Sequence, residues 1–163
     1  DSLAAAISTF VAQNYGSNNP ARCRSGVRVG LGMTLGAVVL LSAILYWWSE
    51  PLGRLFINAS DGGIAVLAAR IMRFIAPTYF LYVFGEVLSG AIRGVGKSLI
   101  PMLITLLTTC VPRILWIVLV VPHSKDIIHI LGCYPVSWAI TATIFIVYYQ
   151  VFKRRSLPVK KGA

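Results

Sequence analysis

Charged residues are scarce in this chain, and their scarcity excludes most soluble folds. Only 12% of the 163 residues are charged, while 57% are hydrophobic and the mean hydropathy is +0.77. A water-soluble domain has about a quarter of its residues charged. A disordered chain would instead have low hydrophobicity. The composition therefore predicts an all-α integral membrane protein.

Few residues can hold a metal or perform chemistry. The three cysteines are an odd number without metal-ligand spacing, so neither a disulfide framework nor a zinc site is expected. No Ser/His/Asp or Cys/His constellation occurs, so we predict no enzyme and no cofactor. The segment Gly90–Ser98 is similar to a phosphate-binding loop, but its spacing is one residue too long and it follows an apolar helix, not a strand. We therefore predict no nucleotide partner.

What the chain does have is a sequence of long apolar stretches. About 20 residues are needed to cross a bilayer, and four stretches reach that length or come close to it: about 27–48, 64–92, 100–121 and 135–152. A shorter stretch, 2–15, is predicted to be the end of a fifth helix, and 153–163 to be a basic cytoplasmic tail. The chain begins at Asp1 and has no signal-peptide pattern, so we expect it to be a piece of a longer protein.

Basic residues lie between the apolar stretches and give a net charge of +10. Because they are spread over short connectors, we predict no nucleic-acid partner. One set of alternate connectors carries ten basic residues and no acid: Arg22, Arg24, Arg28, Arg93, Lys97, Lys153, Arg154, Arg155, Lys160 and Lys161. Cytoplasmic loops carry the excess of basic residues. We therefore predict a multi-pass protein of the cell (inner or plasma) membrane with its C-terminus in the cytoplasm.

Glu86 is an acidic residue within the second full apolar stretch, near its middle. It belongs to a polar stripe at helical spacing: Tyr79, Tyr82, Glu86, Ser89 and Arg93. An ionisable side chain in the bilayer costs about 2.5–3.5 kcal/mol on insertion scales and marks a functional site by default. Glu86 could bind a coupling proton or cation, with Tyr79 and Tyr82 lining the same cavity. Alternatively, it pairs with a basic residue of another helix and only stabilises the bundle.

Arg113 is the second costly residue, within the third full stretch. It follows Pro112, which removes a helix hydrogen bond and is predicted to kink the helix. Arg113 either packs structurally or extends towards the membrane surface, or it lies in the substrate path.

Several smaller features are predicted to be mainly structural. Pro77 predicts a bend in the helix that carries Glu86. The small-residue pattern of Gly32–Gly36 predicts a close helix contact. Gln13, at the end of the first stretch, is assigned to helix packing or to the following loop. Residues 93–96, with Arg93 and two glycines, predict a tight cytoplasmic turn in which glycine permits positive φ.

Several motifs, taken in order, resemble the C-terminal half of a multidrug and toxic compound extrusion (MATE) transporter. The matching segments are Ala5–Gly16, Pro20–Arg22, Phe74–Pro77, Ser89–Gly96, Pro101–Met102 and Pro135–Trp138. The resemblance implies a protein of twelve helices in two six-helix lobes, of which this chain supplies the end of the eighth helix through the twelfth. It also implies that the partners are membrane lipid, a missing N-terminal lobe and small organic substrates, often cationic.

The resemblance further implies alternating access coupled to an inward flow of H+ or Na+. Several members of the family carry the coupling acid about one turn earlier, where this chain has Tyr82, and Glu86 lies on the same helix face. Two other functions stay open. The protein could be a flippase for lipid-linked oligosaccharides from the same superfamily, or a membrane scaffold subunit that transports nothing.

Overall fold

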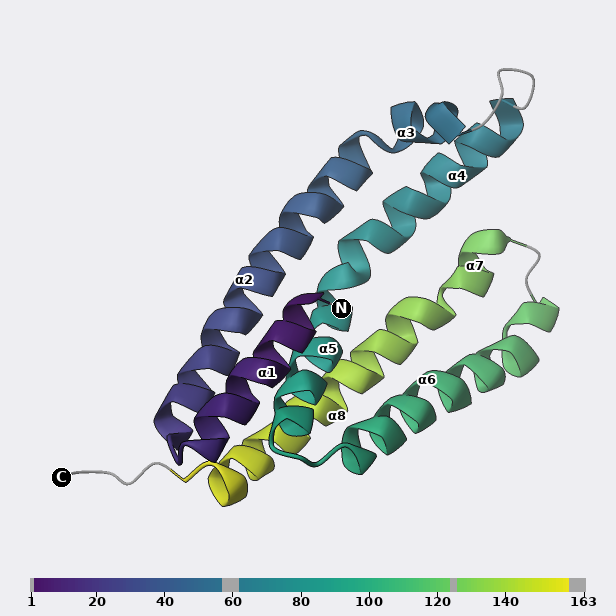
Figure 1. The fold of residues 1–163 in the computed structure, drawn as a ribbon. Coiled ribbons are helices and arrows are strands. Elements are labelled where there is room, and N and C mark those ends of the chain that lie inside the picture. The colour runs from purple at the N-terminus through teal and green to yellow at the C-terminus, as the bar shows by residue number, and fades with distance from the viewer. Residues whose placement is uncertain (1, 57–61, 124–125, 159–163) are drawn as a thin grey trace.

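The computed structural model describes residues 2–56, 62–123 and 126–158, and every regular element in these ranges is helical (Figure 1). The elements are α1 (Ser2–Gly16), α2 (Pro20–Trp47), α3 (Ser49–Phe56), α4 (Gly62–Ile75), the 3-10 turn η2 (Ala76–Thr78), α5 (Tyr79–Gly94), α6 (Leu99–Leu119), the 3-10 turn η3 (Val121–His123), α7 (Ile127–Leu131) and α8 (Cys133–Ser156).

Four helical stretches are long and apolar enough to cross a membrane: Pro20–Trp47, Gly63–Gly94, Leu99–His123 and Ile127–Ser156. Each contains or largely overlaps one of the apolar stretches found in the sequence. Helix α2 begins at Pro20, earlier than expected from hydropathy, because the Asn19 side chain caps it by accepting a hydrogen bond from the backbone N–H of Arg22 at 3.3 Å.

Helix α8 also extends beyond the apolar stretch that predicted it. Residues Lys153, Arg154 and Arg155 form its last turn, so the segment expected to be a tail from 153 onwards is helical as far as Ser156. Basic side chains are favourable at a helix C-terminus, where the helix dipole is negative. Lys160 and Lys161 lie outside the described residues.

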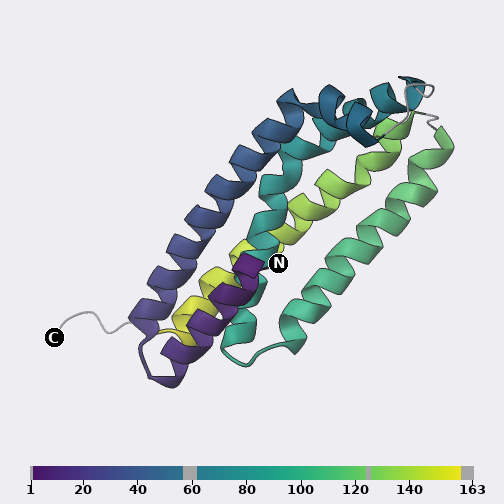
Figure 2. The same ribbon diagram turned by 45° about the horizontal axis from the view of Figure 1, so that its top comes forward.

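The two prolines expected to distort membrane helices behave differently. At Pro77 the α-helix is interrupted by η2, where the Thr78 hydroxyl donates to the Ile75 carbonyl at 2.7 Å. The chain changes direction there, between α4 and α5, which confirms the predicted bend (Figure 2). At Pro112, in contrast, α6 continues without interruption from Leu99 to Leu119, so the predicted kink is not accompanied by any break in the helix.

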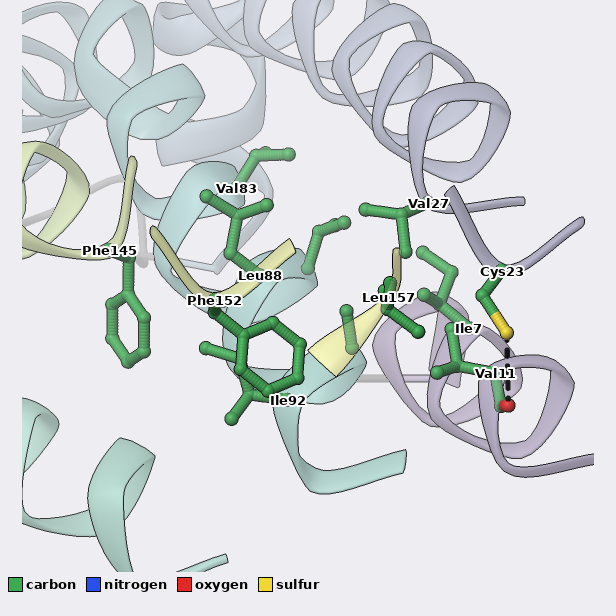
Figure 3. Close-up of a cluster of buried hydrophobic side chains, with 12 residues drawn as sticks. Ile7, Val11, Cys23, Val27, Val83, Leu88, Ile92, Phe145, Phe152 and Leu157 are labelled. Carbon is green, nitrogen blue, oxygen red and sulfur yellow. Dashed lines mark hydrogen bonds between the residues drawn. The ribbon is translucent and has the colours of Figure 1, made fainter. Parts of the chain in front are cut away.

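Helix α5 is the centre of the bundle, and α1, α2 and α8 pack around it. Their side chains form one apolar core near the end of the bundle where the two chain segments 16–20 and 94–99 turn (Figures 1 and 3). The fully or almost fully buried members include Val11, Cys23, Val87, Ile92, Phe145 and Leu157. The Cys23 thiol lies 3.6 Å from the carbonyl oxygen of Val11 and donates to it.

Glycines let α5 approach its neighbours. A Cβ added at Gly94 would lie 2.5 Å from the carbonyl oxygen of Ser8 on α1, and one added at Gly85 would lie 3.2 Å from the Thr141 methyl group on α8. The predicted contact at Gly32–Gly36 is wrong for the described chain, because no atom lies within 4 Å of a Cβ built at Gly32 or Gly36. On α2 the close approaches are instead at Gly26 and Gly30, against side chains of α1.

The two ends of the bundle differ in charge. The α1–α2 and α5–α6 connections and the end of α8 lie at one end, and α3, α7 and the start of α4 lie at the other (Figure 1). The ion pairs found among the described residues are Arg70–Asp126 at 2.9 Å and Arg73–Glu50 at 3.0 Å, and each joins α4 to an element of the second end. The first end has basic residues and no acid in its described part.

Candidate functional site

The candidate site is an accessible face of α5 that carries Tyr79, Tyr82 and Glu86. From Val83 to Ile92, α5 is buried at Val83, Gly85 and every residue from Val87 onwards. Gly85 faces α8, and Gly90 and Gly94 face α1. The accessible part of α5 includes Tyr79, Tyr82, Glu86 and Arg93 of the predicted polar stripe. It also includes two apolar side chains, Phe80, which is exposed, and Phe84, which is half-buried.

The stripe changes in character along the helix. Tyr79 and Tyr82 are 38% and 41% exposed, Glu86 is half-buried and Arg93 is exposed. Ser89 departs from the prediction, because it is buried and its hydroxyl donates to the carbonyl of Glu86 at 3.1 Å, which satisfies it within its own helix. The open face thus presents two phenol rings, one carboxylate and, at its end, one guanidinium.

Trp138 of α8 extends this face, and the sequence did not single it out as a site residue. Its ring centroid lies 5.4 Å from that of Tyr79 in a stacked arrangement and 5.8 Å from that of Tyr82. Tyr134, one turn earlier on α8, contacts the same indole at 6.0 Å. Offset and tilted ring pairs at these distances are mutually stabilising. The sequence contains one indication of Trp138, its place in the motif Pro135–Trp138. That motif does not indicate which residues the Trp138 ring contacts.

Glu86 has no ion pair with any residue that the structure describes. Its carboxylate interacts with the side chain of Tyr82, one turn away on the same face. Glu86 lies eight residues before Gly94, so a rise of about 1.5 Å per residue puts it roughly 12 Å from the basic end of the bundle. The span extends from Gly63 to Gly94, so Glu86 lies about halfway between the middle of the span and its basic end, and not near the middle where we expected it.

Arg113 is not part of this face. Its guanidinium lies 4.4 Å from the centroid of the Tyr134 ring, and its Nε donates to the Ser137 hydroxyl at 3.4 Å. One turn away, the Thr141 hydroxyl lies within hydrogen-bond distance of both the Ser137 carbonyl, at 2.7 Å, and the Thr108 hydroxyl, at 2.8 Å. Arg113 therefore belongs to a polar seam between α6 and α8, as the packing alternative predicts.

The remaining predicted residues lie at helix ends. Gln13 is exposed in the last part of α1, where its carbonyl accepts a hydrogen bond from the N–H of Ser17 at 3.1 Å. Arg93 is in the last turn of α5, and its carbonyl accepts from the N–H of Gly96 at 2.8 Å. Gly96 has φ of 83°, so the predicted positive-φ turn is confirmed at this glycine. Gly94 is required for the close approach of α1, not for its own φ.

Comparison with known proteins identifies the family. A family model described as MatE matches residues 2–119. The chain belongs to this family. It is therefore a multi-pass membrane protein of a transporter family, with the four membrane-crossing helices described above.

The curated relatives carry related names. The chain is 32% identical to the "Probable multidrug resistance protein NorM" of Aromatoleum aromaticum over 63% of its length and 22% of that protein. It is 26% identical to the "Probable multidrug resistance protein YoeA" of Bacillus subtilis, over 96% of the chain and 34% of the relative. For the NorM protein of Thermotoga maritima, the identity is 29% over 69% of the chain and 24% of the relative.

This MatE chain thus spans between 22% and 34% of the length of the curated relatives that it matches. No solved structure matches it significantly.

Proposed function

We propose that this chain forms part of the C-terminal lobe of an ion-coupled antiporter that exports organic compounds, with Glu86 as the group that binds the coupling ion. The observation that carries the proposal is the position of this carboxylate. It is half-buried on α5, the helix against which α1, α2 and α8 pack, and it lies one turn from Tyr82, whose ring contacts Trp138 of α8. Its membership of the MatE family supports a transport role.

The chemistry of Glu86 suits an exchange site. A carboxylate in a membrane-spanning segment is costly unless it is paired, protonated or in contact with water. Glu86 is half-buried, without a basic partner in the described part of the chain, and has the Tyr82 hydroxyl as its neighbour. It can therefore hold one proton or contribute to a cation site, and it can release either when the open face meets water. H+ and Na+ are both compatible with this arrangement.

The aromatic surface beside Glu86 suits organic cations. Tyr79, Tyr82 and Trp138 bring three aromatic rings together next to the carboxylate. Aromatic faces attract organic cations, and a nearby negative charge adds to that attraction. The two curated relatives named above as NorM are described as multidrug resistance proteins, which supports small organic substrates. Bound ion and bound substrate would then compete for one acidic, aromatic surface.

The proposal requires a second lobe. An open polar face on α5 can form a cavity only if another part of the protein lies opposite it. The chain covers at most 34% of the relatives that it matches, so the proposed partner is an N-terminal lobe, and membrane lipid surrounds both. We further propose a location in the cell membrane with the C-terminus in the cytoplasm, on the basis of the basic end of the bundle.

The test is ion-driven efflux by the complete transporter in proteoliposomes. Glu86→Gln removes the ionisable group but keeps the shape of the side chain, so we expect substrate export driven by a proton or sodium gradient to fall to the background rate. Glu50→Gln is the matched control, because Glu50 is exposed at the other end of the bundle and pairs with Arg73. Export by Glu86→Gln at the wild-type rate would overturn the proposal.

The same preparation separates the two alternatives. A flippase would move a lipid-linked oligosaccharide and confer no drug resistance, and it would need a cationic cavity. Arg113 instead packs between α6 and α8, and Arg73 pairs with Glu50. A scaffold subunit would keep Glu86 paired and dry. A cysteine at position 86 that fails to react with a small water-soluble thiol reagent would therefore contradict transport.

A further inference from the structure

A cavity with basic and polar lining lies between α2, α5 and α8 near the basic end of the bundle, and Glu86 is not among its lining residues. Its volume is about 310 Å3, within the size range of small-molecule sites. Helices α2 and α8 both pack on α5 but make few contacts with each other, so a wedge-shaped space remains between the three helices. We call this cavity the wedge. Phe84 and Leu88 of α5 are among the residues that line it.

The lining divides into a basic part and an apolar part. Arg24, Arg28 and Lys153 supply three positive charges, and Tyr149 and Gln150 add polar groups. Val27, Leu31 and Ile146 continue the lining with aliphatic surface. No described acid pairs with any of the three basic side chains, since the ion pairs found in the described ranges involve Arg70 and Arg73. The cavity is therefore amphipathic and strongly positive at one end.

The hydrogen bonds of Arg24 show that the described residues do not satisfy the whole of this positive part. Its Nη2 donates to the carbonyl of Lys153 at 2.7 Å, which joins α2 to α8 across the end of the wedge. Its Nε is buried and has no hydrogen-bond partner among the residues that the structure describes. A buried donor on a charged group is costly to leave unpaired. Tyr149 interacts electrostatically with both Arg24 and Arg28, so these groups converge on one small volume.

We propose that this wedge binds an anionic phospholipid, with the headgroup phosphate at Arg24, Arg28 and Lys153 and an acyl chain along the aliphatic lining. Arg and Lys donors match phosphate oxygens in charge and geometry. Basic pockets between membrane helices on the cytoplasmic side bind anionic headgroups. A lipid explains both halves of the lining, whereas a free phosphate ion would use only the basic part. The inference does not depend on the ion-coupling role of Glu86.

The experiment measures lipid binding to the purified full-length protein by native mass spectrometry. The three probes are phosphatidylglycerol, phosphatidylcholine with the same acyl chains, and inorganic phosphate. For the wild type we expect phosphatidylglycerol to bind more tightly than phosphatidylcholine. The double variant Arg28→Gln with Lys153→Gln should lose about tenfold or more of its affinity for phosphatidylglycerol and fall to the level of phosphatidylcholine. Arg24 is left intact because it also joins the helices.

The matched control is Arg154→Gln with Arg155→Gln, which removes the same charge from exposed positions of α8 at the same end of the bundle. It should retain the preference for phosphatidylglycerol within about twofold, and so should the conservative pair Arg28→Lys with Lys153→Arg. An equal loss in the Arg154/Arg155 variant would overturn the proposal, because general surface charge would then explain binding. Displacement of phosphatidylglycerol by inorganic phosphate at equal concentration would overturn it as well.

Discussion

Trp138 takes part in the proposed substrate surface through its ring contacts with two tyrosines. It joins Tyr79 and Tyr82 of α5 to α8 at centroid distances of 5.4 and 5.8 Å. Trp138→Ala removes the shared ring, so we expect the apparent affinity for aromatic cations to fall about three- to tenfold, as the loss of one aromatic contact worth about 0.5–1.5 kcal/mol would predict. Competition binding in the complete transporter measures this. Trp138→Phe should retain most of the affinity, and an unchanged affinity in Trp138→Ala would place the substrate elsewhere.

Asp126 should make stability depend on pH at the second end of the bundle. The N–H of Ile128, which donates to Asp126 at 3.1 Å, is the main cause that lowers the pKa of its carboxyl, and the Arg70 guanidinium adds to the effect. A lowered folded-state pKa means that the contribution is present above the unfolded pKa of about 3.9 and is lost as pH falls through the folded pKa.

We therefore expect Asp126→Ala to lower the unfolding temperature at pH 7, and we expect this difference to shrink as the pH falls below about 3.9, because the wild-type carboxylate is then progressively protonated. Thermal unfolding in detergent across this pH range is the measurement. Arg70→Gln serves as a comparison, because it removes the ion pair but leaves the helix cap, and its effect should be smaller. A constant difference at all pH values would contradict this account.

At the scale of helices, the approach of α1 to α5 depends on Gly94. An added Cβ would lie 2.5 Å from the Ser8 carbonyl and 3.0 Å from the Cβ of Val11. Gly94→Ala should therefore destabilise the bundle by about 1–3 kcal/mol, a typical cost of overpacking. Gly32→Ala is the control, since nothing lies within 4 Å there and alanine is the better helix former. Denaturation that showed equal stabilities for the two variants would refute the close contact.

The helices themselves are largely predictable because hydropathy and capping are local properties. The bend at Pro77 also follows from local chemistry. The continuity of α6 at Pro112 does not, because α6 is also held against α8 by the Thr141–Thr108 and Arg113–Ser137 hydrogen bonds. The predicted contact at Gly32–Gly36 of α2 was wrong for the same reason, because helix packing is not a local property. The spacing at Gly32–Gly36 is a helix-contact pattern, but only the position of α1 selects Gly26 and Gly30 instead.

For the whole molecule, the charge difference between the two ends predicts an orientation. In a chain with a single cysteine at position 158, in place of Pro158, we expect a membrane-impermeant thiol reagent to label that cysteine only after the cells are permeabilised, because the proposed orientation puts the basic end in the cytoplasm. A single cysteine in place of His123, which is exposed at the other end, should be labelled in intact cells. The reverse pattern would show that the protein is inserted the other way.

The sequence by itself determined the class of protein, the approximate helices, the uneven distribution of charge and the presence of one costly carboxylate on a polar stripe. These follow from composition and periodicity, which need no knowledge of neighbours. Only the tertiary structure decided that Tyr79, Tyr82 and Glu86 of this stripe stay accessible while Ser89 is buried. It also decided that Trp138 joins the stripe and that Arg113 is held between α6 and α8. Which face of a helix stays open depends on where other helices pack, and packing joins residues that are far apart in the chain.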